Sequence, residues 1–296
     1  MKALVTGITG FTGPYLANAL NKRGISVVGL GHAPADIPRV DRVHIVDVTN
    51  SKAVREVVLD EKPELAVHLA AISLVVHGDV DEIYHTNLMG TRNFLDALAL
   101  LEQRPQSVLV ASSSNVYGNR NEGIMRESMI PDPVNDYSVS KVATELIAGL
   151  YKSRLPICVV RPFNYTGVGQ SSAFLIPKIV EHVRSGHTNI RLGNLEVARD
   201  FSDVRFVAEA YARLLQSPSA AGRTVNVSSG QACQMSEILN KVELISGQKL
   251  NVLVAPELVR ENEVRSLWGD SSLLDQLIGP IDRIPLEETL RWMIEA

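Results

Sequence analysis

The run Gly7-Ile8-Thr9-Gly10-Phe11-Thr12-Gly13, which directly follows the apolar stretch Ala3–Val5, decides the fold of this chain. Glycines at this GxxGxxG spacing permit a tight turn, a close approach of the backbone to a ligand, and close packing of a helix on a strand. Pro14 follows where the first turn of a helix tolerates proline. Free N–H groups at the start of such a helix attract anions. We therefore expect a dinucleotide pyrophosphate to contact Gly7, Gly10, Phe11, Thr12 and Gly13.

Short apolar runs alternate with helical stretches through the first half of the chain. The predicted strands are Ala3–Val5, Ser26–Leu30, Val43–Val46, Leu65–Leu69, Ser107–Ala111, Ile157–Val160 and Thr224–Val227. Nearly continuous apolar runs of this kind are typical of strands covered on both faces. The predicted helices are Tyr15–Lys22, Lys52–Asp60, Ile83–Leu101 and Ser138–Ser153. This alternation predicts an α/β fold with a doubly wound parallel sheet of the Rossmann type and about seven strands.

The alternation loosens after Arg161. Phe163–Ser172 and Ser217–Arg223 are rich in turn-forming residues and are predicted to be loops, and three prolines punctuate the tail after Gly247. We therefore predict a dinucleotide-binding Rossmann domain made of residues 1–160 and 196–230. Residues 161–195 and 231–296 are predicted to form a smaller, discontinuous substrate-binding region.

Composition and charge exclude several classes of function. The 296 residues carry a formal net charge of −4, without the basic excess that a nucleic-acid binder needs. No apolar run approaches the roughly 18 residues that span a bilayer. Cys158 and Cys233 do not make a disulfide framework, and the histidines show no metal-ligand spacing. Because the chain begins with a strand-like segment rather than a leader, we expect a cytoplasmic protein with no metal, nucleic-acid or membrane partner.

The ends of three further strands bear on the choice of cofactor. The second strand ends in Gly31-His32, without the acidic residue that binds a ribose 2′-hydroxyl and repels a 2′-phosphate. NADPH is therefore favoured, with NADH as the alternative because no arginine stands at the strand end either. Asp47, followed by Val48, is a candidate contact to adenine, and a solvated loop aspartate is the alternative. Leu69, Ala70 and Ala71, at the end of the fourth strand, complete the expected cofactor contacts.

Tyr137 and Lys141 are spaced i, i+4, so on a helix they share one face. A nearby ammonium favours the phenolate and is expected to bring the tyrosine pKa down from about 10. Ser112-Ser113-Ser114 follows the fifth strand, at the sheet edge where open α/β folds bind ligands. An isolated YxxxK is more often a surface pair. Here the glycine loop, the serine run and YxxxK occur in order, which indicates a hydride-transfer site.

These elements together resemble the extended short-chain dehydrogenases, the NAD-dependent epimerase/dehydratase family, and residues 113–118 (SSNVYG) match that family's SxxVYG segment. The resemblance implies that Ser113 is the catalytic hydroxyl and that Tyr137 exchanges a proton with a carbonyl or hydroxyl oxygen. It also implies that Lys141 binds the nicotinamide ribose. Members commonly pair through two helices per subunit, so a homodimer through Ile83–Leu101 and Ser138–Ser153 is expected.

Three segments are similar to those of relatives that act on GDP-mannose derivatives: residues 161–170 (RPFNYTGVGQ), 199–204 (RDFSDV) and 260–270 (RENEVRSLWGD). The resemblance implies a nucleotide-diphosphate sugar as substrate, preferably a GDP-sugar. Arg199 and Arg260 would contact its diphosphate, because a guanidinium can bind two phosphate oxygens at once. Glu263 would accept hydrogen bonds from ribose hydroxyls, and Asn115 and Asn164 are the remaining candidate substrate contacts.

The residue two places after Ser113 separates the reactions that such relatives catalyse. Dehydratases place a glutamate there as a base, and Asn115 carries an amide that cannot act as one. Epimerase-reductases place a cysteine there, which is also absent. The remaining Ser-Tyr-Lys set suits plain reduction of a ketone. The resemblance to relatives that act on GDP-mannose derivatives then implies reduction of the 4-keto group of GDP-4-keto-6-deoxy-D-mannose to GDP-D-rhamnose or its C4 epimer, GDP-6-deoxy-talose. The alternatives are a nucleotide-sugar 4,6-dehydratase or epimerase, and a cofactor-binding protein without catalysis.

Overall fold

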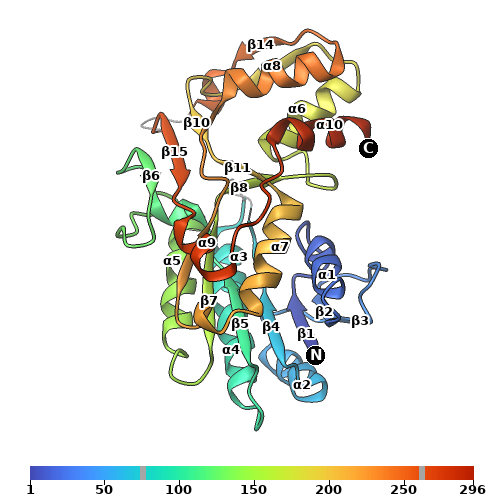
Figure 1. Cartoon of the computed structure of the whole chain (residues 1–296), viewed down its shortest axis with the longest axis vertical. Coiled ribbons are helices and arrows are strands. Elements are labelled where there is room, and N and C mark those ends of the chain that lie inside the picture. Colours follow the sequence, from blue (N-terminus) through green and yellow to red (C-terminus); the bar gives the residue numbers. More distant parts are fainter. Residues whose placement is uncertain (74–77, 260–263) are drawn as a thin grey trace.

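Seven apolar runs of the sequence become one parallel sheet, in the order β12-β7-β5-β4-β1-β2-β3. The structure is a computed structural model that describes residues 1–73, 78–259 and 264–296 (Figure 1). The strands are β1 (Lys2–Thr6), β2 (Ser26–Gly31), β3 (Arg42–Ile45), β4 (Leu65–His68), β5 (Ser107–Ala111), β7 (Ile157–Pro162) and β12 (Thr224–Val227). Each predicted strand is present, and its ends shift by at most two residues. The predicted doubly wound sheet is therefore confirmed.

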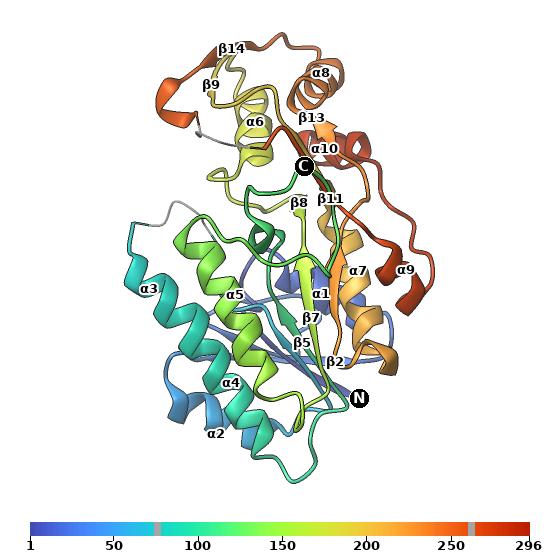
Figure 2. The same cartoon turned by 90° about the vertical axis from the view of Figure 1, so that its left-hand side faces the viewer.

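Helices cover both faces of this sheet, as right-handed crossovers between parallel strands require. On one face lie α2 (Ser51–Glu61), α4 (Gly90–Ala99) and α5 (Asp136–Gly149). The other face carries α1 (Gly13–Asn21), α7 (Val204–Leu215) and α9 (Ser272–Ile278), and Figure 2 shows the two layers on opposite sides. Each layer has its own apolar core, which holds the carboxyl ends of the strands in fixed positions.

The predicted helix Ile83–Leu101 is interrupted. It consists of α3 (Val80–Tyr84), the π-helical segment η1 (His85–Met89) and α4, in direct succession. The side chain of Asp79 caps the start of α3 by accepting the N–H of Glu82 at 3.0 Å. π-Helical turns are rare and occur often at functional sites.

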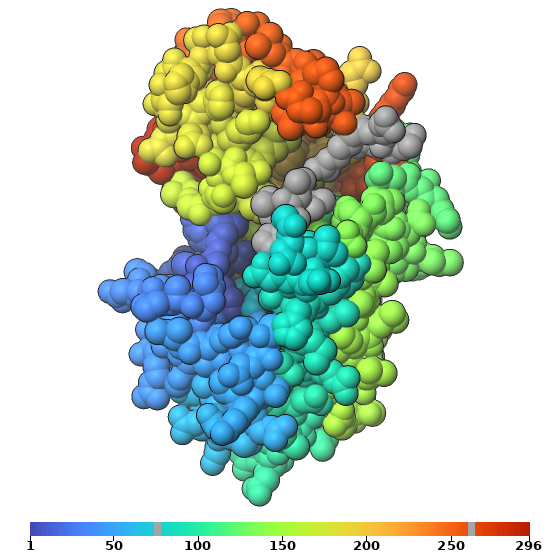
Figure 3. All heavy atoms as spheres, turned by 180° about the vertical axis from the view of Figure 1, so that it is seen from behind, coloured from blue at the N-terminus to red at the C-terminus, as the bar shows by residue number. Residues whose placement is uncertain are grey.

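A smaller part of the chain lies beyond the carboxyl edge of the sheet and has an apolar core of its own. It contains α6 (Leu175–Arg184), β9 (Asn189–Leu192), α8 (Met235–Ser246), β14 (Asn251–Val254), η4 (Pro256–Leu258) and α10 (Leu286–Glu295). The molecule is hollowed between this part and the N-terminal segments of the sheet domain (Figure 3). Helix α9, which falls within the predicted substrate region, packs instead against α7 on the sheet domain.

Two small sheets join the two parts. One has the order β13 (Cys233–Gln234), β10 (Ala198–Arg199), β15 (Ser266–Gly269) and β6 (Gly123–Met125), and the other pairs β8 (Asn164–Thr166) with β11 (Phe201–Asp203). The prediction of a loop over Phe163–Ser172 is therefore wrong for β8, whose backbone pairs with β11. The predicted loop Ser217–Arg223 contains the short helix η3 (Pro218–Ala220). None of the helices in the described part of the chain is long and apolar enough to cross a membrane.

Candidate active site

The predicted site residues meet at the carboxyl edge of the central sheet. The glycine loop follows β1, Asp47 lies two residues after β3, Leu69 follows β4, and Ser113 lies two residues after β5. The chain runs from β1 outward to β3 and then returns to β4 on the other side of β1. Such a reversal of strand order leaves a crevice at the strand ends, which is where open α/β sheets bind their ligands.

The glycine loop is shaped to receive a phosphate group. Gly7 has a φ of +68°, and a Cβ atom there would lie 2.7 Å from the backbone nitrogen of Ala70. A Cβ on Gly13 would lie 2.1 Å from the carbonyl oxygen of Ile8, so only glycine allows α1 to start this close to β1. Within the described residues, the N–H groups of Phe11 and Thr12 make no hydrogen bond. These two donors at the start of α1 fit the pyrophosphate of a dinucleotide.

Tyr165 is a site residue that the sequence reasoning missed. Its hydroxyl lies 2.8 Å from Thr12 Oγ1, and its ring stacks on Phe11 with a centroid distance of 5.9 Å. Tyr165 belongs to β8, which is far from the glycine loop in sequence. Its place within RPFNYTGVGQ was a signal, but only the pairing of β8 with β11 brings it to the loop.

The remaining predicted cofactor contacts lie beside this loop. Asp47 is exposed, and its Oδ1 accepts hydrogen bonds from the N–H and hydroxyl of Thr49, both at 2.8 Å. Val48 is buried, and its Cγ2 lies 2.7 Å from the point that a Cβ on Gly90 would occupy. The N–H of Ala70, in the half-buried segment 69–71, donates to Thr6 Oγ1 at 3.2 Å.

Ser113 and Tyr137 are coupled by a hydrogen bond. Ser113 Oγ accepts the N–H of Asn115 at 3.2 Å, and the Ser113 side chain also hydrogen-bonds Tyr137. Tyr137 opens α5, where Asn135 and Ser138 form a capping box, and its side chain is 7% exposed. Burial raises the pKa of Tyr137 to about 12, and the bond from Ser113 lowers it in part. The phenol is therefore held in its protonated form at neutral pH.

Lys141 lies one turn further along α5 and is almost fully buried. Its Nζ donates to the carbonyl oxygen of Ala111 at 2.9 Å and lies 6.0 Å from the centroid of the Tyr137 ring. Burial lowers the pKa of Lys141 to about 8, and the charge of Glu145 opposes that shift. The expectation that the ammonium brings the Tyr137 pKa below its usual value is not met in this structure, because burial outweighs the other influences.

A buried ion pair behind the serine run is the second feature that sequence reasoning missed. Arg161 and Glu145 form two hydrogen bonds, Nε to Oε1 at 2.8 Å and Nη2 to Oε2 at 2.7 Å. Ser112 Oγ donates to Glu145 Oε1 at 2.5 Å, and Arg161 lies over the ring of Tyr117. Glu145 follows Lys141 by four residues, so the pair ties the catalytic helix to β7 and to the serine run.

The predicted substrate residues are only partly assembled. Asn115 and Asn164 are exposed, and Asn164 Nδ2 donates to the carbonyl oxygen of Asp200 at 3.2 Å. Arg199 is half-buried, with Nη1 donating to the carbonyl oxygens of Ala198 and Arg265. Arg260 and Glu263 lie outside the described residues.

Asp200, in the RDFSDV segment, holds the junction of the two parts together. Its Oδ1 accepts the N–H and the hydroxyl of Ser229 at 2.8 and 2.7 Å. Its Oδ2 accepts the N–H groups of Gly230 and Gly269 at 3.1 and 3.2 Å. One buried carboxylate therefore links β10, the segment after β12, and β15.

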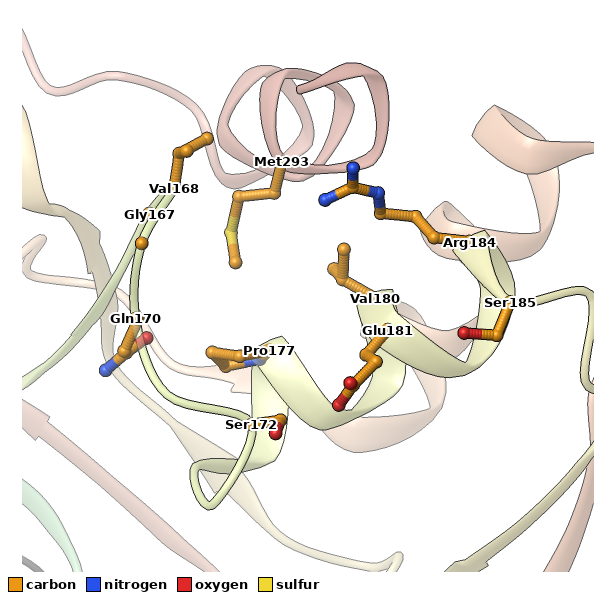
Figure 4. Close-up of a pocket in the computed structure, with 11 residues that line it drawn as sticks. Gly167, Val168, Gln170, Ser172, Pro177, Val180, Glu181, Arg184, Ser185 and Met293 are labelled. Atoms are coloured by element: carbon orange, nitrogen blue, oxygen red, sulfur yellow. The ribbon is translucent and has the colours of Figure 1, made fainter.

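A separate cavity of about 470 Å³ lies between residues 167–172, α6 and α10, and none of the predicted site residues that the structure describes lines it. Arg184 and Glu181 of α6 and Met293 of α10 border it (Figure 4).

The fold and this site define a nicotinamide-dependent enzyme of the short-chain dehydrogenase class: a glycine loop at the first strand–helix turn, with serine, tyrosine and lysine gathered at the same sheet edge. The comparison with known families confirms this reading. The chain belongs to the NAD dependent epimerase/dehydratase family, whose model matches residues 3–228.

Two relatives match along almost the whole chain. GDP-6-deoxy-D-talose 4-dehydrogenase of Aggregatibacter actinomycetemcomitans is 34% identical, covering 94% of this chain and 92% of that protein. GDP-6-deoxy-D-mannose reductase of Pseudomonas aeruginosa is 30% identical, covering 99% of this chain and 96% of that protein. Among solved structures, RMD from Pseudomonas aeruginosa complexed with NADPH is 28% identical, with a TM-score of 0.86 over 99% of this chain and 98% of that chain.

Proposed function

We propose that this protein is an NAD(P)H-dependent reductase of the 4-keto group of a nucleotide-diphosphate 6-deoxy-sugar. The substrate is GDP-4-keto-6-deoxy-D-mannose, and the product is GDP-D-rhamnose or its C4 epimer, GDP-6-deoxy-talose. The observation that carries the proposal is the buried, protonated Tyr137 coupled to Ser113 at the carboxyl edge, with Lys141 beside it. The two relatives named for GDP-6-deoxy-sugars support the substrate class.

The chemistry follows from how Ser113 and Tyr137 are held. The ketone oxygen would lie between the two hydroxyls, with Ser113 donating a hydrogen bond to it. As this oxygen becomes an alkoxide it is more basic than the phenol, so the proton moves from Tyr137 Oη to it. The ammonium of Lys141, near the tyrosine ring, then stabilises the phenolate left behind. A bound nicotinamide supplies the hydride for this reduction.

We propose NADPH as the preferred cofactor, with NADH as the alternative. Its pyrophosphate would lie on the free N–H groups of Phe11 and Thr12, and Lys141 would contact the nicotinamide ribose. No acidic side chain follows β2 within Gly31–His32, so a 2′-phosphate meets no repulsion there. The structure of RMD complexed with NADPH supports this choice.

The carboxylates near the serine run favour reduction over elimination. A 4,6-dehydratase needs a free base beside the sugar, and Asn115 occupies the position expected for it. Glu145 is engaged by Arg161 and Ser112. Glu127 Oε1 accepts the N–H of Asn226 at 2.9 Å. These two carboxylates are thus already bound and are unsuited to act as that base.

The activity is tested by mixing the protein with GDP-4-keto-6-deoxy-D-mannose and NADPH and following nicotinamide absorbance. We expect oxidation of NADPH, and a loss of about 10²- to 10⁴-fold in kcat for Tyr137→Phe, because the proton donor is removed. Tyr151→Phe is the matched control, since Tyr151 lies just beyond α5 and bonds Asp96 instead. Turnover of GDP-mannose alone, without reduction of the ketone, would establish the dehydratase alternative. Full activity of Tyr137→Phe would show that Tyr137 is not the proton donor, and the absence of NADPH oxidation by the wild type would favour a cofactor-binding protein without this catalysis.

The stereochemistry of the product is decided by proton NMR of the purified sugar nucleotide. An equatorial C4 hydroxyl gives a large coupling between H4 and H5 and identifies GDP-D-rhamnose. An axial hydroxyl gives a small coupling and identifies GDP-6-deoxy-talose.

We further propose that the protein is a homodimer that pairs through α4 and α5. Val139, Leu146 and Leu150 recur on one face of the α5 segment, and the last two are 69% and 74% exposed. Helices α4 and α5 lie side by side (Figure 2). Light scattering should give twice the monomer mass for the wild type. The double variant that carries both L146D and L150D should give the monomer mass. Leu244→Asp, on α8, is the exposed control.

The cytoplasmic location expected from the sequence stays a prediction.

A further inference from the structure

His68 ends β4 and is buried at the centre of a hydrogen-bonded network. The ring is 2% exposed and stacks on Phe94 of α4, with a centroid distance of 5.4 Å. Nδ1 lies 2.8 Å from Thr6 Oγ1, at the end of β1, and Nε2 lies 3.0 Å from Thr91 Oγ1, on α4. Both ring nitrogens therefore have partners, and each partner belongs to a different element.

The neighbouring bonds fix the direction of these two contacts, because a hydroxyl carries a single proton. Thr6 Oγ1 accepts the N–H of Ala70 at 3.2 Å, which leaves its own proton available to His68 Nδ1. Thr91 Oγ1 gives its proton to the carbonyl oxygen of Asn87 at 2.6 Å, so it accepts from His68 Nε2. Every proton then has an acceptor only if the ring is neutral and protonated on Nε2.

The chain of bonds continues through the π-helical segment η1 to the catalytic helix. Asn87 Oδ1 accepts the N–H of Ile72 at 2.8 Å, and Nδ2 donates to the carbonyl oxygen of Ile72 at 3.2 Å. Nδ2 also donates to Ser140 Oγ at 2.9 Å, and Ser140 donates to the carbonyl oxygen of Tyr137 at 2.7 Å. An unbroken series of bonds thus runs from the strand that carries the glycine loop to the first turn of α5.

We propose that His68, as the neutral Nε2–H tautomer, is a positioning residue that couples the segment 69–72 to the catalytic helix α5. The residue touches neither reacting atoms nor cofactor and acts through Thr6, Thr91 and Asn87. The inference rests on the proposed function, because it takes Leu69, Ala70 and Ala71 as the cofactor contacts expected from the sequence and α5 as the catalytic helix. Burial and the positive charge of Lys141, which faces the ring from α5, lower the pKa of His68 to about 3, so the ring stays neutral at working pH.

The tautomer is tested by nitrogen-15 NMR of histidine-labelled wild-type protein, with His68→Gln used to assign the signal. We expect a protonated Nε2 and a bare Nδ1 for His68, with no titration between about pH 5 and about pH 9. A proton on Nδ1, or titration in that range, would overturn the proposal. This measurement needs neither cofactor nor activity.

The coupling is tested by Thr91→Val and Thr91→Ser, which remove and retain the hydroxyl that accepts from His68. For Thr91→Val we expect faster amide exchange at Ala70 and Ile72 and about fivefold weaker NADPH binding. Thr91→Ser should restore both to within about twofold. The matched control is Thr289→Val, because Thr289 is equally buried but bonds Asp203 on the far side of the site. It should leave exchange at Ala70 and Ile72 unchanged.

The proposed coupling would be refuted if amide exchange at Ala70 and Ile72 in Thr91→Val were as slow as in the wild type. It would also be refuted if Thr91→Ser and Thr91→Val changed exchange and NADPH binding equally. Equal acceleration by Thr289→Val would do so too, because it would show a loss of stability alone. Absence of NADPH binding to the wild-type protein would instead overturn the proposed function, and the exchange rates would still decide whether the coupling exists.

Discussion

Replacing Lys141 by methionine should make the protein more stable at neutral pH while abolishing its activity. The side chain is buried, and its pKa is lowered from 10.5 to about 8. A difference of this size corresponds to roughly 3 kcal/mol against the charged form in the folded state. Methionine avoids this penalty. It also loses the hydrogen bond to Ala111, and this loss cancels about 1 kcal/mol of the gain in stability. We therefore expect Lys141→Met to raise the free energy of unfolding by about 2 kcal/mol at pH 7.

The same reasoning fixes how this gain depends on pH. The folded-state pKa lies below the unfolded one, so folding opposes protonation of Lys141. The free-energy penalty is complete below about pH 8. It shrinks as the pH rises from there towards 10.5, the pKa of this lysine in the unfolded chain. At pH 9.5 the advantage of the methionine variant should therefore fall to less than about 1 kcal/mol.

Urea denaturation of the wild type and Lys141→Met at the two pH values measures this difference. Lys152→Met is the control, because Lys152 is exposed just after α5 and its loss should change stability by less than about 0.5 kcal/mol at either pH. A methionine variant that is less stable than the wild type at pH 7 would refute the argument. An advantage that does not change with pH would refute it as well.

Three other predictions concern the cofactor loop, the junction and the pH dependence of catalysis. Gly7→Ala should destabilise the protein by about 2 kcal/mol more than Gly24→Ala in thermal unfolding, and it should weaken NADPH binding. Both glycines have a positive φ, but only a Cβ on Gly7 would clash with Ala70, because a Cβ on Gly24 meets nothing within 4 Å. Equal losses would show that the contact with Ala70 is harmless. Asp200→Asn should cost about 2 to 4 kcal/mol in urea unfolding, because its amide N–H₂ would face the N–H groups of Gly230 and Gly269. A loss below about 1 kcal/mol would contradict the role of this carboxylate at the junction. The kcat/KM for the ketone should fall as pH rises through about 8, where Lys141 loses its proton. A profile that stays flat to about pH 10 would show that the ammonium is not needed.

The sheet was predictable because its signals are local. Each strand is a short apolar run, and burial on both faces leaves such a run little alternative to the interior of a parallel sheet. The glycine loop was equally predictable, since Gly7 has a positive φ and the backbone that Gly13 packs against belongs to the nearby Ile8. Tyr137 and Lys141 could be proposed from order and spacing, and Ser113 from the resemblance of residues 113–118 to the SxxVYG segment. Their placement at one sheet edge follows from the topology that the same pattern predicts.

Long-range contacts decided the rest. Tyr165 reaches the glycine loop only because β8 pairs with β11, and two-residue strands such as β10 carry too few residues to show a period. The pKa of Tyr137 was misjudged from its spacing to Lys141, because burial is a property of the folded chain and not of the helix.

His68 shows the same division most clearly. It lies within the predicted strand Leu65–Leu69, and the structure shows that its ring is buried. Sequence alone predicted the sheet, the glycine loop and the candidate catalytic side chains. Only the tertiary structure decided the burial that shifts the pKa values of Tyr137 and Lys141. It also decided the hydrogen bonds that join His68 and Asn87 to β1, α4 and α5, because these elements are far apart in the sequence.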